Sequence, residues 1–246
     1  MTTATLTRDI TLEVAHNVRH IGGYRTRGGR ITSPAFIRAG GLQNLTAGSL
    51  EAIRSMGIRT VVDFRSAPER DEHATPDLAP YALRHVVAPV FESDGSPAGL
   101  ATNFPGYPTV YRSFLETGRD AYRTLAETIA ESNGGLLFHC AVGKDRTGVA
   151  AALLLDLAGV PQEVIIEDYA HSERNLRPML PKWKEGMAAR GLDVSRAEEL
   201  MASHPADMGD LLGHLTRTWG SAAGYFASIG VAPATLRAVR ERLLSA

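Results

Sequence analysis

The feature that most constrains the fold is an apolar strand that runs into a helix through one short loop. Three apolar residues at 136–138 lead directly into His139 and Cys140, and Arg146 opens the next helical stretch. Strands that alternate with helices along a chain are typical of a mostly parallel sheet, whose ligand sites lie at the carboxyl ends of its strands. The sequence therefore predicts an α/β fold with a ligand site in the loop after Cys140.

Other segments repeat this alternation. Thr46 is a plausible N-cap, and the residues after it have the apolar spacing of a helix. Periodicity and turn residues together predict short strands between 17 and 41, a helix from Thr46 to Gly57, strands over 60–64 and 83–90, and a helix over 110–132. Three prolines in 91–108 predict a long surface loop, and the chain after Pro161 reads as helical throughout.

Composition excludes several classes of protein. The 246 residues carry 26 basic and 27 acidic side chains, so the formal net charge of -1 argues against a nucleic-acid partner held by bulk phosphate neutralisation. The most apolar stretch, 148–160, is interrupted by Asp156 and is shorter than the ~20 residues of a membrane span. We therefore expect no nucleic acid and no integral membrane association, and the oligomeric state stays open.

The single cysteine, Cys140, rules out an intramolecular disulfide and a zinc site of the multi-cysteine kind. The N-terminus has no apolar leader segment typical of secretion. These features predict a cytoplasmic protein, with signal-independent secretion left open.

The loop from Cys140 to Arg146 has the composition of an anion cradle. Backbone amides of Ala141, Val142, Gly143 and Lys144 can converge on one point, and the dipole of the following helix adds about half a positive charge there. The planar guanidinium of Arg146 could hold two oxygens of a phosphoryl group.

The same positive field favours the thiolate form of Cys140, which would then be a nucleophile placed beneath the phosphorus. Thr147 could offer its hydroxyl to the sulfur, and His139 could hold the loop through backbone carbonyls. The alternative interpretation is that Cys140 is a small buried apolar residue followed by an ordinary turn. The specified pattern of eight loop positions favours the catalytic interpretation.

The loop sequence His-Cys-x-x-Gly-Lys-Asp-Arg-Thr-Gly at 139–148 resembles the phosphate loop of cysteine-dependent phosphatases, specifically the bacterial and fungal tyrosine phosphatase family, which includes a secreted mycobacterial dual-specificity and lipid phosphatase. The resemblance extends over most of the chain: similar segments occur at 17–24, at 57–69 including Glu69, at Asp168-Tyr169 and near Tyr225. His20 and Ala39 depart from the family pattern, which usually has Asp and Ser there.

This resemblance implies a cysteine-phosphatase fold, with a central mostly parallel sheet flanked by helices and a C-terminal helical lid. It implies one phosphatase domain over 1–246, in which 174–220 is a lid insertion. The implied activity is hydrolysis of phosphomonoesters through a cysteinyl-phosphate intermediate, without a cofactor or metal. A phosphorylated protein or a phosphoinositide would be the substrate, and a lysine at the position of Lys144 accompanies polyphosphorylated substrates in tensin-type lipid phosphatases.

Three aspartates compete for the role of the acid that protonates the leaving group. Asp145 lies inside the loop and ranks first, because the family pattern suggests an acid or orienting role there. Asp94 lies in the long loop after the second core strand and ranks next. Asp63 ends a core strand and is expected to contact substrate or orient water, although its neighbour Arg65 also fits a structural ion pair.

Two further groups of residues have weaker interpretations. Five arginines without an intervening acid could make the approach to the site electropositive, or form a solvated face: Arg19, Arg25, Arg27, Arg30 and Arg38. An acidic and histidine group at 167–173 has no matching ligand cluster elsewhere, so no metal is expected. A silent phosphate-binding module is the alternative function, and the intact Cys140 and Arg146 argue against it.

Overall fold

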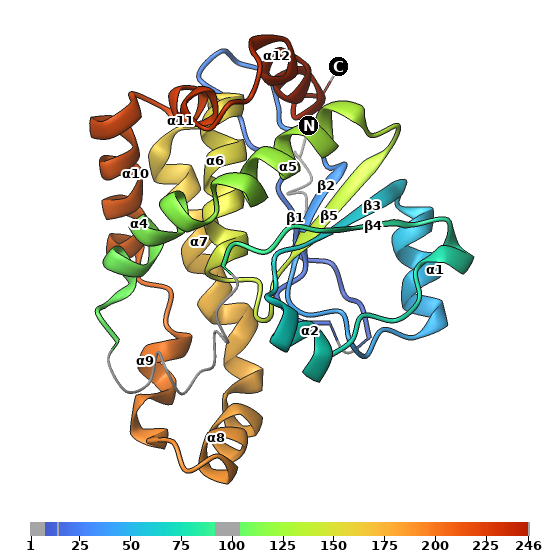
Figure 1. Ribbon diagram of the computed structural model, residues 1–246, viewed down its shortest axis with the longest axis vertical. Helices are drawn as coiled ribbons and strands as arrows, with labels where there is room; N and C mark the ends of the chain where they lie inside the picture. The colour runs from blue at the N-terminus through green and yellow to red at the C-terminus, as the bar shows by residue number, and fades with distance from the viewer. Residues whose placement is uncertain (1–7, 14, 92–103, 246) are drawn as a thin grey trace, which may run out of the picture.

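A five-stranded sheet organises the chain, with strand order β1-β2-β5-β3-β4 (Figure 1). The computed structural model describes residues 8–13, 15–91 and 104–245. The strands are β1 (Arg19–His20), β2 (Phe36–Ala39), β3 (Ile58–Asp63), β4 (Arg84–Val87) and β5 (Gly135–His139). The β1–β2 pair is antiparallel and the other pairs are parallel. The predicted mostly parallel α/β sheet is confirmed.

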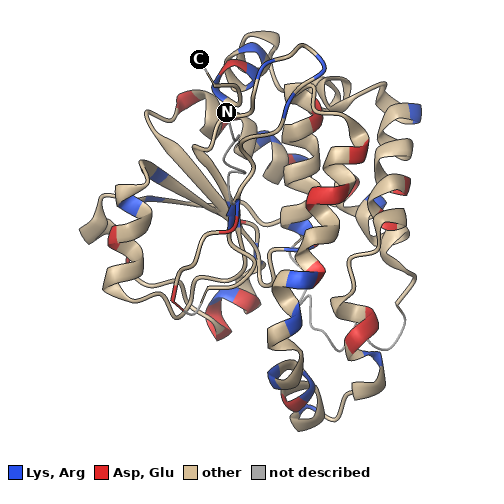
Figure 2. Ribbon diagram, turned by 180° about the vertical axis from the view of Figure 1, so that it is seen from behind, with Lys and Arg blue, Asp and Glu red and all other residues tan. Residues whose placement is uncertain are grey.

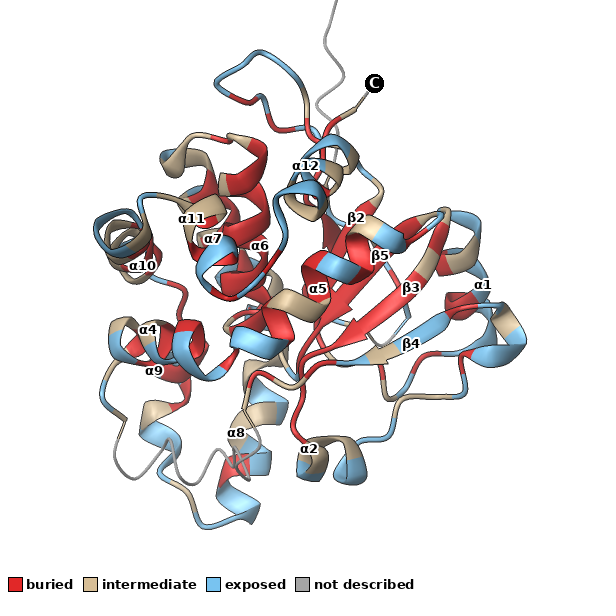
Figure 3. Cartoon of the chain, turned by 45° about the horizontal axis from the view of Figure 1, so that its top comes forward, coloured by how far each residue is buried: buried red, intermediate tan, exposed pale blue. Residues whose placement is uncertain are grey.

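Side chains alternate between the two faces of the sheet. Ile37, Leu137 and Val61 stand side by side across β2, β5 and β3, and they belong to the smaller core cluster, which includes residues of α1 (Ala47–Ser55). One residue further along each strand, Phe138 and Val62 belong to the larger core cluster with α6 (Arg146–Ala158). Both faces of the central strands are therefore buried, as Figure 3 shows, and this explains their continuous apolar sequence.

The strand, loop and helix around Cys140 follow the sequence expectation. β5 ends at His139, and α6 begins at Arg146. Nearly every side chain of α6 is buried, and the helix ends at Gly159, whose φ of 88° is a conformation that glycine adopts without strain. The predicted N-cap is also confirmed, because the Thr46 side chain accepts a hydrogen bond from the Ser49 amide.

The expected single helix over 110–132 is wrong. The structure has two helices, α4 (Tyr107–Thr117) and α5 (Arg119–Glu131), which meet at Gly118. A Cβ atom at Gly118 would lie 2.6 Å from the Phe114 carbonyl oxygen and 2.9 Å from the Tyr122 ring. Only glycine fits such a close junction, and the helical run is interrupted there.

The chain after Pro161 is helical, as expected, but it divides into two parts. Its helices are α7 (Gln162–Leu176), α8 (Leu180–Ala189), α9 (Ala197–Met201), α10 (Pro205–Trp219), α11 (Ala222–Ser228) and α12 (Pro233–Arg242). The remaining helix, α2 (Ala67–Glu72), follows β3. α8 and α9 share a small apolar cluster of their own and extend away from the sheet (Figure 1). α10 packs against α4, α7 and α11 and buries Met208 and Leu211 in the main core. The lid over 174–220 stays a prediction. In that range α10 belongs to the main core, whereas α8 and α9 pack on their own cluster.

No helix among the described residues is both long and apolar enough to cross a membrane. The cytoplasmic location expected from the sequence stays a prediction.

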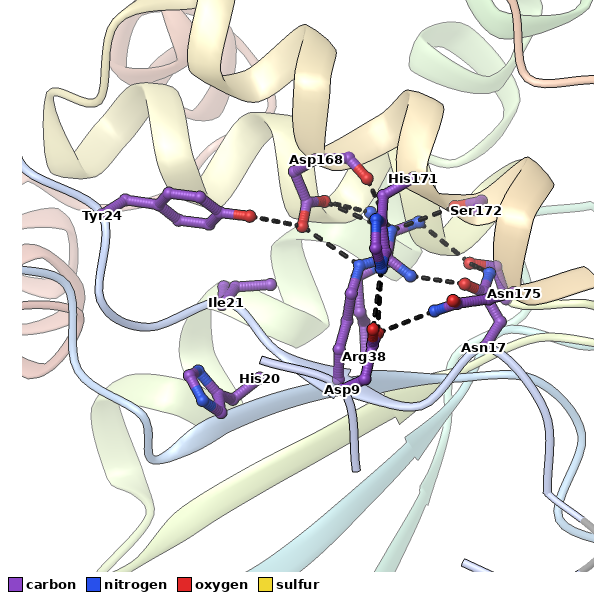
Figure 4. A network of polar contacts seen from close by, with 12 residues as sticks. Asp9, Asn17, His20, Ile21, Tyr24, Arg38, Asp168, His171, Ser172 and Asn175 are labelled. Atoms are coloured by element: carbon purple, nitrogen blue, oxygen red, sulfur yellow. Dashed lines mark hydrogen bonds and ion pairs between the residues drawn. The ribbon is translucent and has the colours of Figure 1, made fainter. Parts of the chain in front are cut away.

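A buried ionic network ties α7 to the N-terminal strands (Figure 4). The Asp168 carboxylate of α7 accepts from Arg19 Nε at 3.1 Å and from Arg38 Nη1 at 2.5 Å, and all three side chains are at most 2% exposed. Burial alone would raise the pKa of Asp168, but the two guanidinium groups outweigh it and hold the pKa well below its ordinary value. Arg19 and Arg38 are therefore internal, so they do not form the electropositive approach that the arginine run suggested, and Figure 2 shows basic and acidic residues interspersed along the helices.

We predict that Asp168→Asn destabilises the protein by about 3–5 kcal/mol, because it leaves two buried guanidinium groups without their shared counter-ion. Denaturant unfolding at neutral pH measures this difference. Tyr24→Phe is the matched control, since it removes only the Tyr24 hydroxyl that donates to Asp168 at 2.9 Å, a loss of about 1 kcal/mol.

The effect of Asp168 also depends on pH in a defined direction. Its pKa in the folded protein lies below the ordinary value of 3.8, so the stabilisation is complete above that pH and is lost as the pH falls below it. The difference in unfolding free energy between the wild type and Asp168→Asn should therefore shrink only in strong acid. A difference below about 1 kcal/mol at neutral pH would contradict the role assigned to the network.

Candidate active site

Cys140 lies at the carboxyl end of β5, at the start of the loop that leads to α6. Its side chain is buried, and Sγ accepts a hydrogen bond from the Gly143 amide at 3.3 Å. Gly143 has a φ of 74°, and a Cβ there would lie 2.5 Å from the backbone of Ala39. The loop thus folds back over the sulfur at a position that only glycine can occupy.

The carbonyl of Ala141 points outward from the loop, where it accepts from the Gly41 amide at 2.9 Å. In a trans peptide the N–H points opposite to the C=O, so this contact directs the Val142 amide inward. The described peptides are all trans. The expected convergence of amides on one point is consistent with this arrangement, and the substrate-binding roles of Ala141, Val142 and Gly143 stay predictions.

Arg146 is held by a carboxylate that follows a different strand. Its Nη1 and Nη2 atoms each contact one oxygen of Glu69 in α2, both at 2.6 Å. Burial disfavours the cation, yet the Glu69 hydrogen bonds and the nearby Cys140 raise the pKa of Arg146. Burial would likewise raise the pKa of Glu69, but Arg146 outweighs it and the pKa is lowered. Both groups are charged at neutral pH.

This pairing leaves one side of the Arg146 guanidinium available. Glu69 occupies the end formed by the two Nη atoms, and Nη1 also lies 3.5 Å from the Phe64 carbonyl oxygen. Among the described residues no acceptor contacts Nε. The side formed by Nε and Nη2 can therefore grip two oxygens of a phosphoryl group while Glu69 keeps the plane fixed.

The sequence analysis named Glu69 only as part of the family resemblance. The residues around it nevertheless predict that Glu69 lies in the first turn of a helix. Ser66 and Glu69 form a capping box at the start of α2, in which Glu69 accepts from the Ser66 amide at 2.9 Å. The same carboxylate thus caps a helix and fixes Arg146.

Asp145 has a partner that the sequence did not indicate. The Tyr111 hydroxyl contacts Asp145 Oδ1 at 2.7 Å, and it also lies 2.6 Å from the Tyr169 hydroxyl. Burial, followed by the charge of Asp145, raises the pKa of Tyr111 well above its ordinary value, so Tyr111 is a neutral donor. Tyr111 lies on an amphipathic helix, where an aromatic residue is indistinguishable from core packing before the fold is known.

The Lys144 ammonium group does not face a ligand, although the resemblance to lipid phosphatases with a lysine here suggested that it would. Its ammonium group donates to the carbonyl oxygens of Leu200 at 2.9 Å and Ala202 at 2.8 Å, and it lies 3.8 Å from the centre of the Tyr107 ring. The side chain is only 1% exposed. Lys144 therefore fastens the loop to the end of α9, and contact of its ammonium with substrate would require those bonds to break.

Asp63 is the structural ion pair that the sequence offered as its alternative interpretation. It is fully buried and accepts from Arg65 through Nε at 2.9 Å and Nη2 at 2.7 Å. Burial alone would raise the pKa of Asp63, but the nearby His85, whose Nε2 lies 3.7 Å from Oδ2, and the hydrogen bonds from Arg65 outweigh it, and the pKa is lowered. Because both oxygens are engaged below the surface, Asp63 does not contact a ligand in this arrangement, contrary to its proposed place among the substrate-binding residues.

His139 holds the loop as expected, with Nδ1 lying 3.2 Å from the Cys140 carbonyl oxygen. Burial lowers the pKa of His139 to about 4, so the ring is neutral at neutral pH and donates from Nδ1 in this contact. With Asp63 and His85 it forms a group whose ligand atoms lie within 4.8 Å of one another. The Arg65 guanidinium already occupies the Asp63 carboxylate, so this group does not fit a metal ion well.

Three further expectations concern Thr147, the acidic and histidine group at 167–173, and Asp94. Thr147 is fully buried, and no described residue forms a hydrogen bond with its Oγ1 atom. The hydroxyl is therefore available to donate a hydrogen bond to the Cys140 sulfur. The acidic and histidine group at 167–173 does not converge, because Asp168 points into the ionic network and His171 pairs with Asp9 at 2.8 Å. Asp94 lies outside the described residues.

Comparison with known proteins assigns the family. A model described as the tyrosine phosphatase family matches residues 10–245, which is nearly the whole chain. The chain belongs to the tyrosine phosphatase family. The resemblance inferred from the loop and its flanking motifs is confirmed, as is the α/β fold with a mostly parallel sheet.

Two individual relatives agree with this assignment. The chain is 31% identical to a tyrosine-protein phosphatase from Nostoc commune over 228 residues, covering 87% of this chain and 75% of the relative. It is 31% identical to the triple specificity protein phosphatase PtpB of Mycobacterium tuberculosis over 148 residues, covering 54% and 53%. Among solved structures, a putative phosphatase from Neisseria meningitidis matches with a TM-score of 0.35 at 20% identity, covering 58% of this chain and 87% of that one.

We predict that Glu69→Ala lowers the kcat/KM of this phosphatase by about 10- to 100-fold, because Arg146 loses the carboxylate that fixes its plane. Glu69→Gln keeps one acceptor for Arg146 and should lose less. Steady-state kinetics with p-nitrophenyl phosphate measures both. Glu72→Ala in the same helix is the control, since Glu72 lies on the surface and pairs with Arg190. Equal kinetics in Glu69→Ala and wild type would contradict the proposed clamp.

Proposed function

We propose that this member of the tyrosine phosphatase family hydrolyses phosphotyrosine in proteins through a cysteinyl-phosphate intermediate on Cys140. The observation that carries the proposal is the sulfur beneath the folded loop, with the Gly143 amide directed at it and Arg146 fixed by Glu69. This arrangement supplies a nucleophile and charge neutralisation for a phosphoryl group from the protein itself, so the mechanism requires no metal or other cofactor.

In the first step the Cys140 sulfur attacks phosphorus, an S–P bond forms, and the bond from phosphorus to the tyrosine oxygen breaks. The loop amides and the free side of Arg146 bind the three equatorial oxygens. In the second step water attacks the cysteinyl phosphate, the S–P bond breaks, and inorganic phosphate leaves. The Thr147 hydroxyl, which has no other described partner, donates to the departing sulfur.

Asp145 is the proposed proton donor to the leaving oxygen and acceptor from the attacking water. It begins the helix at the loop, and its side chain is about one quarter exposed, so it can reach a bound substrate. Tyr111 and Lys144 both contact Oδ1, at 2.7 and 3.4 Å, which fixes the carboxyl group and leaves Oδ2 for the proton transfer.

The substrate range beyond phosphotyrosine is part of the same proposal. The similarity to PtpB, whose name describes triple specificity, supports testing phosphoserine and phosphoinositides as further substrates. The burial of Lys144 removes the feature that suggested a polyphosphorylated ligand, and the burial of Arg19 and Arg38 weakens the electropositive approach that would have favoured one. Phosphotyrosine is therefore the first substrate we expect, with phosphoinositide hydrolysis as the lesser activity.

We predict that Cys140→Ser abolishes hydrolysis of p-nitrophenyl phosphate and of a phosphotyrosine peptide in buffer containing a metal chelator, while the variant still binds inorganic phosphate. Serine keeps the loop and Arg146 but is a much weaker nucleophile at neutral pH. Phosphate release and calorimetry measure the two properties. Substantial turnover by Cys140→Ser would exclude the covalent mechanism, and binding without turnover by the wild type would favour the silent phosphate-binding module.

A second prediction concerns the acid. Asp145→Asn should slow the hydrolysis of alkyl phosphates, whose leaving oxygen needs a proton, about 10²- to 10⁴-fold, and it should slow aryl phosphates with acidic phenols much less. A series of leaving groups of increasing acidity measures this dependence. Asp94→Asn is the comparison, and if it rather than Asp145→Asn shows the dependence, then Asp94 is the acid.

A further inference from the structure

One loop carbonyl is held by two buried side chains. The Gly143 carbonyl oxygen accepts from Arg38 Nη2 at 2.9 Å and from Asn17 Nδ2 at 3.0 Å. Arg38 comes from β2 and is fully buried, and Asn17 lies just before β1 and is 4% exposed. Two donors, one of them charged, therefore fix the direction of a single peptide group in the loop.

The direction of this carbonyl decides where the next amide points. The Gly143–Lys144 peptide is trans, so its N–H lies opposite to the C=O. With the carbonyl drawn outward to Arg38 and Asn17, the Lys144 amide is directed toward the concave side of the loop. The preceding peptide has the same orientation, because Asn17 Nδ2 lies 3.5 Å from the Val142 carbonyl oxygen while the Gly143 amide donates to Cys140 Sγ.

Arg38 is itself held in place from the other side. Its Nη1 atom pairs with Asp168, whose carboxylate is also bound by Arg19 and by the Tyr24 hydroxyl (Figure 4). Burial is the main influence that lowers the pKa of Arg38, to about 10, so the guanidinium remains charged at neutral pH. The two arginines and one aspartate leave one positive charge beside the loop, which favours an anion there.

We propose that Arg38 is a positioning residue for phosphoryl binding, which with Asn17 keeps the Lys144 amide directed at the bound anion, while Asn17 also holds the peptide whose Gly143 amide donates to the Cys140 sulfur. The role deepens the function proposed above and rests on it. Arg38 does not touch the substrate; it acts through the Gly143 carbonyl. Without it the peptide can rotate, and its carbonyl oxygen would then face the phosphoryl group that the loop has to bind.

The experiment compares Arg38→Met with wild type and with Tyr24→Phe. Methionine fills much of the arginine volume and leaves the Arg19–Asp168 pair intact, so the remaining buried charges are balanced. Tyr24→Phe perturbs the same carboxylate without touching the loop. For each folded variant, calorimetry gives the affinity for inorganic phosphate, and kinetics with p-nitrophenyl phosphate gives kcat and KM per active molecule.

We expect Arg38→Met to weaken phosphate binding by about tenfold or more and to lower kcat/KM at least as much, while Tyr24→Phe leaves both near wild type. If Arg38 only braced the fold, Arg38→Met would lose active molecules but keep the phosphate affinity of those that remain. Unchanged affinity in the folded variant therefore overturns the proposal.

Asn17→Gly provides a second variant if Arg38→Met does not fold. Asn17 has a φ of 55°, which glycine adopts freely, so this change removes the amide donor, together with the Oδ1 acceptor of Arg19 Nη1, with little backbone strain. It should weaken phosphate binding several-fold, and an unchanged affinity would overturn the proposal in this case too. A failure of the proposed function is seen separately, because wild type would then bind phosphate without Cys140-dependent hydrolysis.

Discussion

The carboxylate of Asp168 is shared by two buried guanidinium groups, and the relative positions of α7, β1 and β2 depend on this shared charge. Removing three ionised groups from water is costly, and their mutual attraction compensates only when the geometry is well satisfied. Here further donors and acceptors complete it: Tyr24 donates to Asp168, and Arg19 donates to the Ser172 hydroxyl at 3.0 Å. The network thereby fixes Arg38, which donates to the Gly143 carbonyl oxygen in the loop after Cys140.

In the proposed active site, the cations Arg146 and Lys144 are each paired with a carboxylate before any anion binds. The Arg146 cation is paired with Glu69 at one end of its guanidinium, and the Lys144 ammonium lies 3.4 Å from Asp145. What remains for the ligand is the free side of Arg146 and the loop amides. These are fixed dipoles and donors that need no reorganisation when charge arrives, which is the property that stabilises a phosphoryl transition state.

The sequence correctly predicted those helices, strands and caps that depend only on residues close to one another in the chain. The strand before Cys140, the helix from Arg146 and the Thr46 cap each follow from apolar spacing or a capping side chain within a few residues. The division at Gly118 was missed because it depends on how closely two helices meet. Lys144, Asp63 and Arg38 were misplaced for a related reason: whether a charged side chain faces solvent or the interior depends on partners such as Leu200, Arg65 and Asp168, which lie on other elements.

Lys144 shows how the loop is joined to the region that was expected to form a lid. Its acceptors are the main-chain carbonyls of Leu200 and Ala202, and Tyr107 also donates to the Leu200 carbonyl at 2.6 Å. Moving the end of α9 away from the site would break these bonds and leave an ammonium group in a place where burial already lowers its pKa. Such a charge is costly without its partners. The end of α9 and the loop after Cys140 are therefore energetically coupled, and a displacement of one must be accompanied by rearrangement or hydration of Lys144.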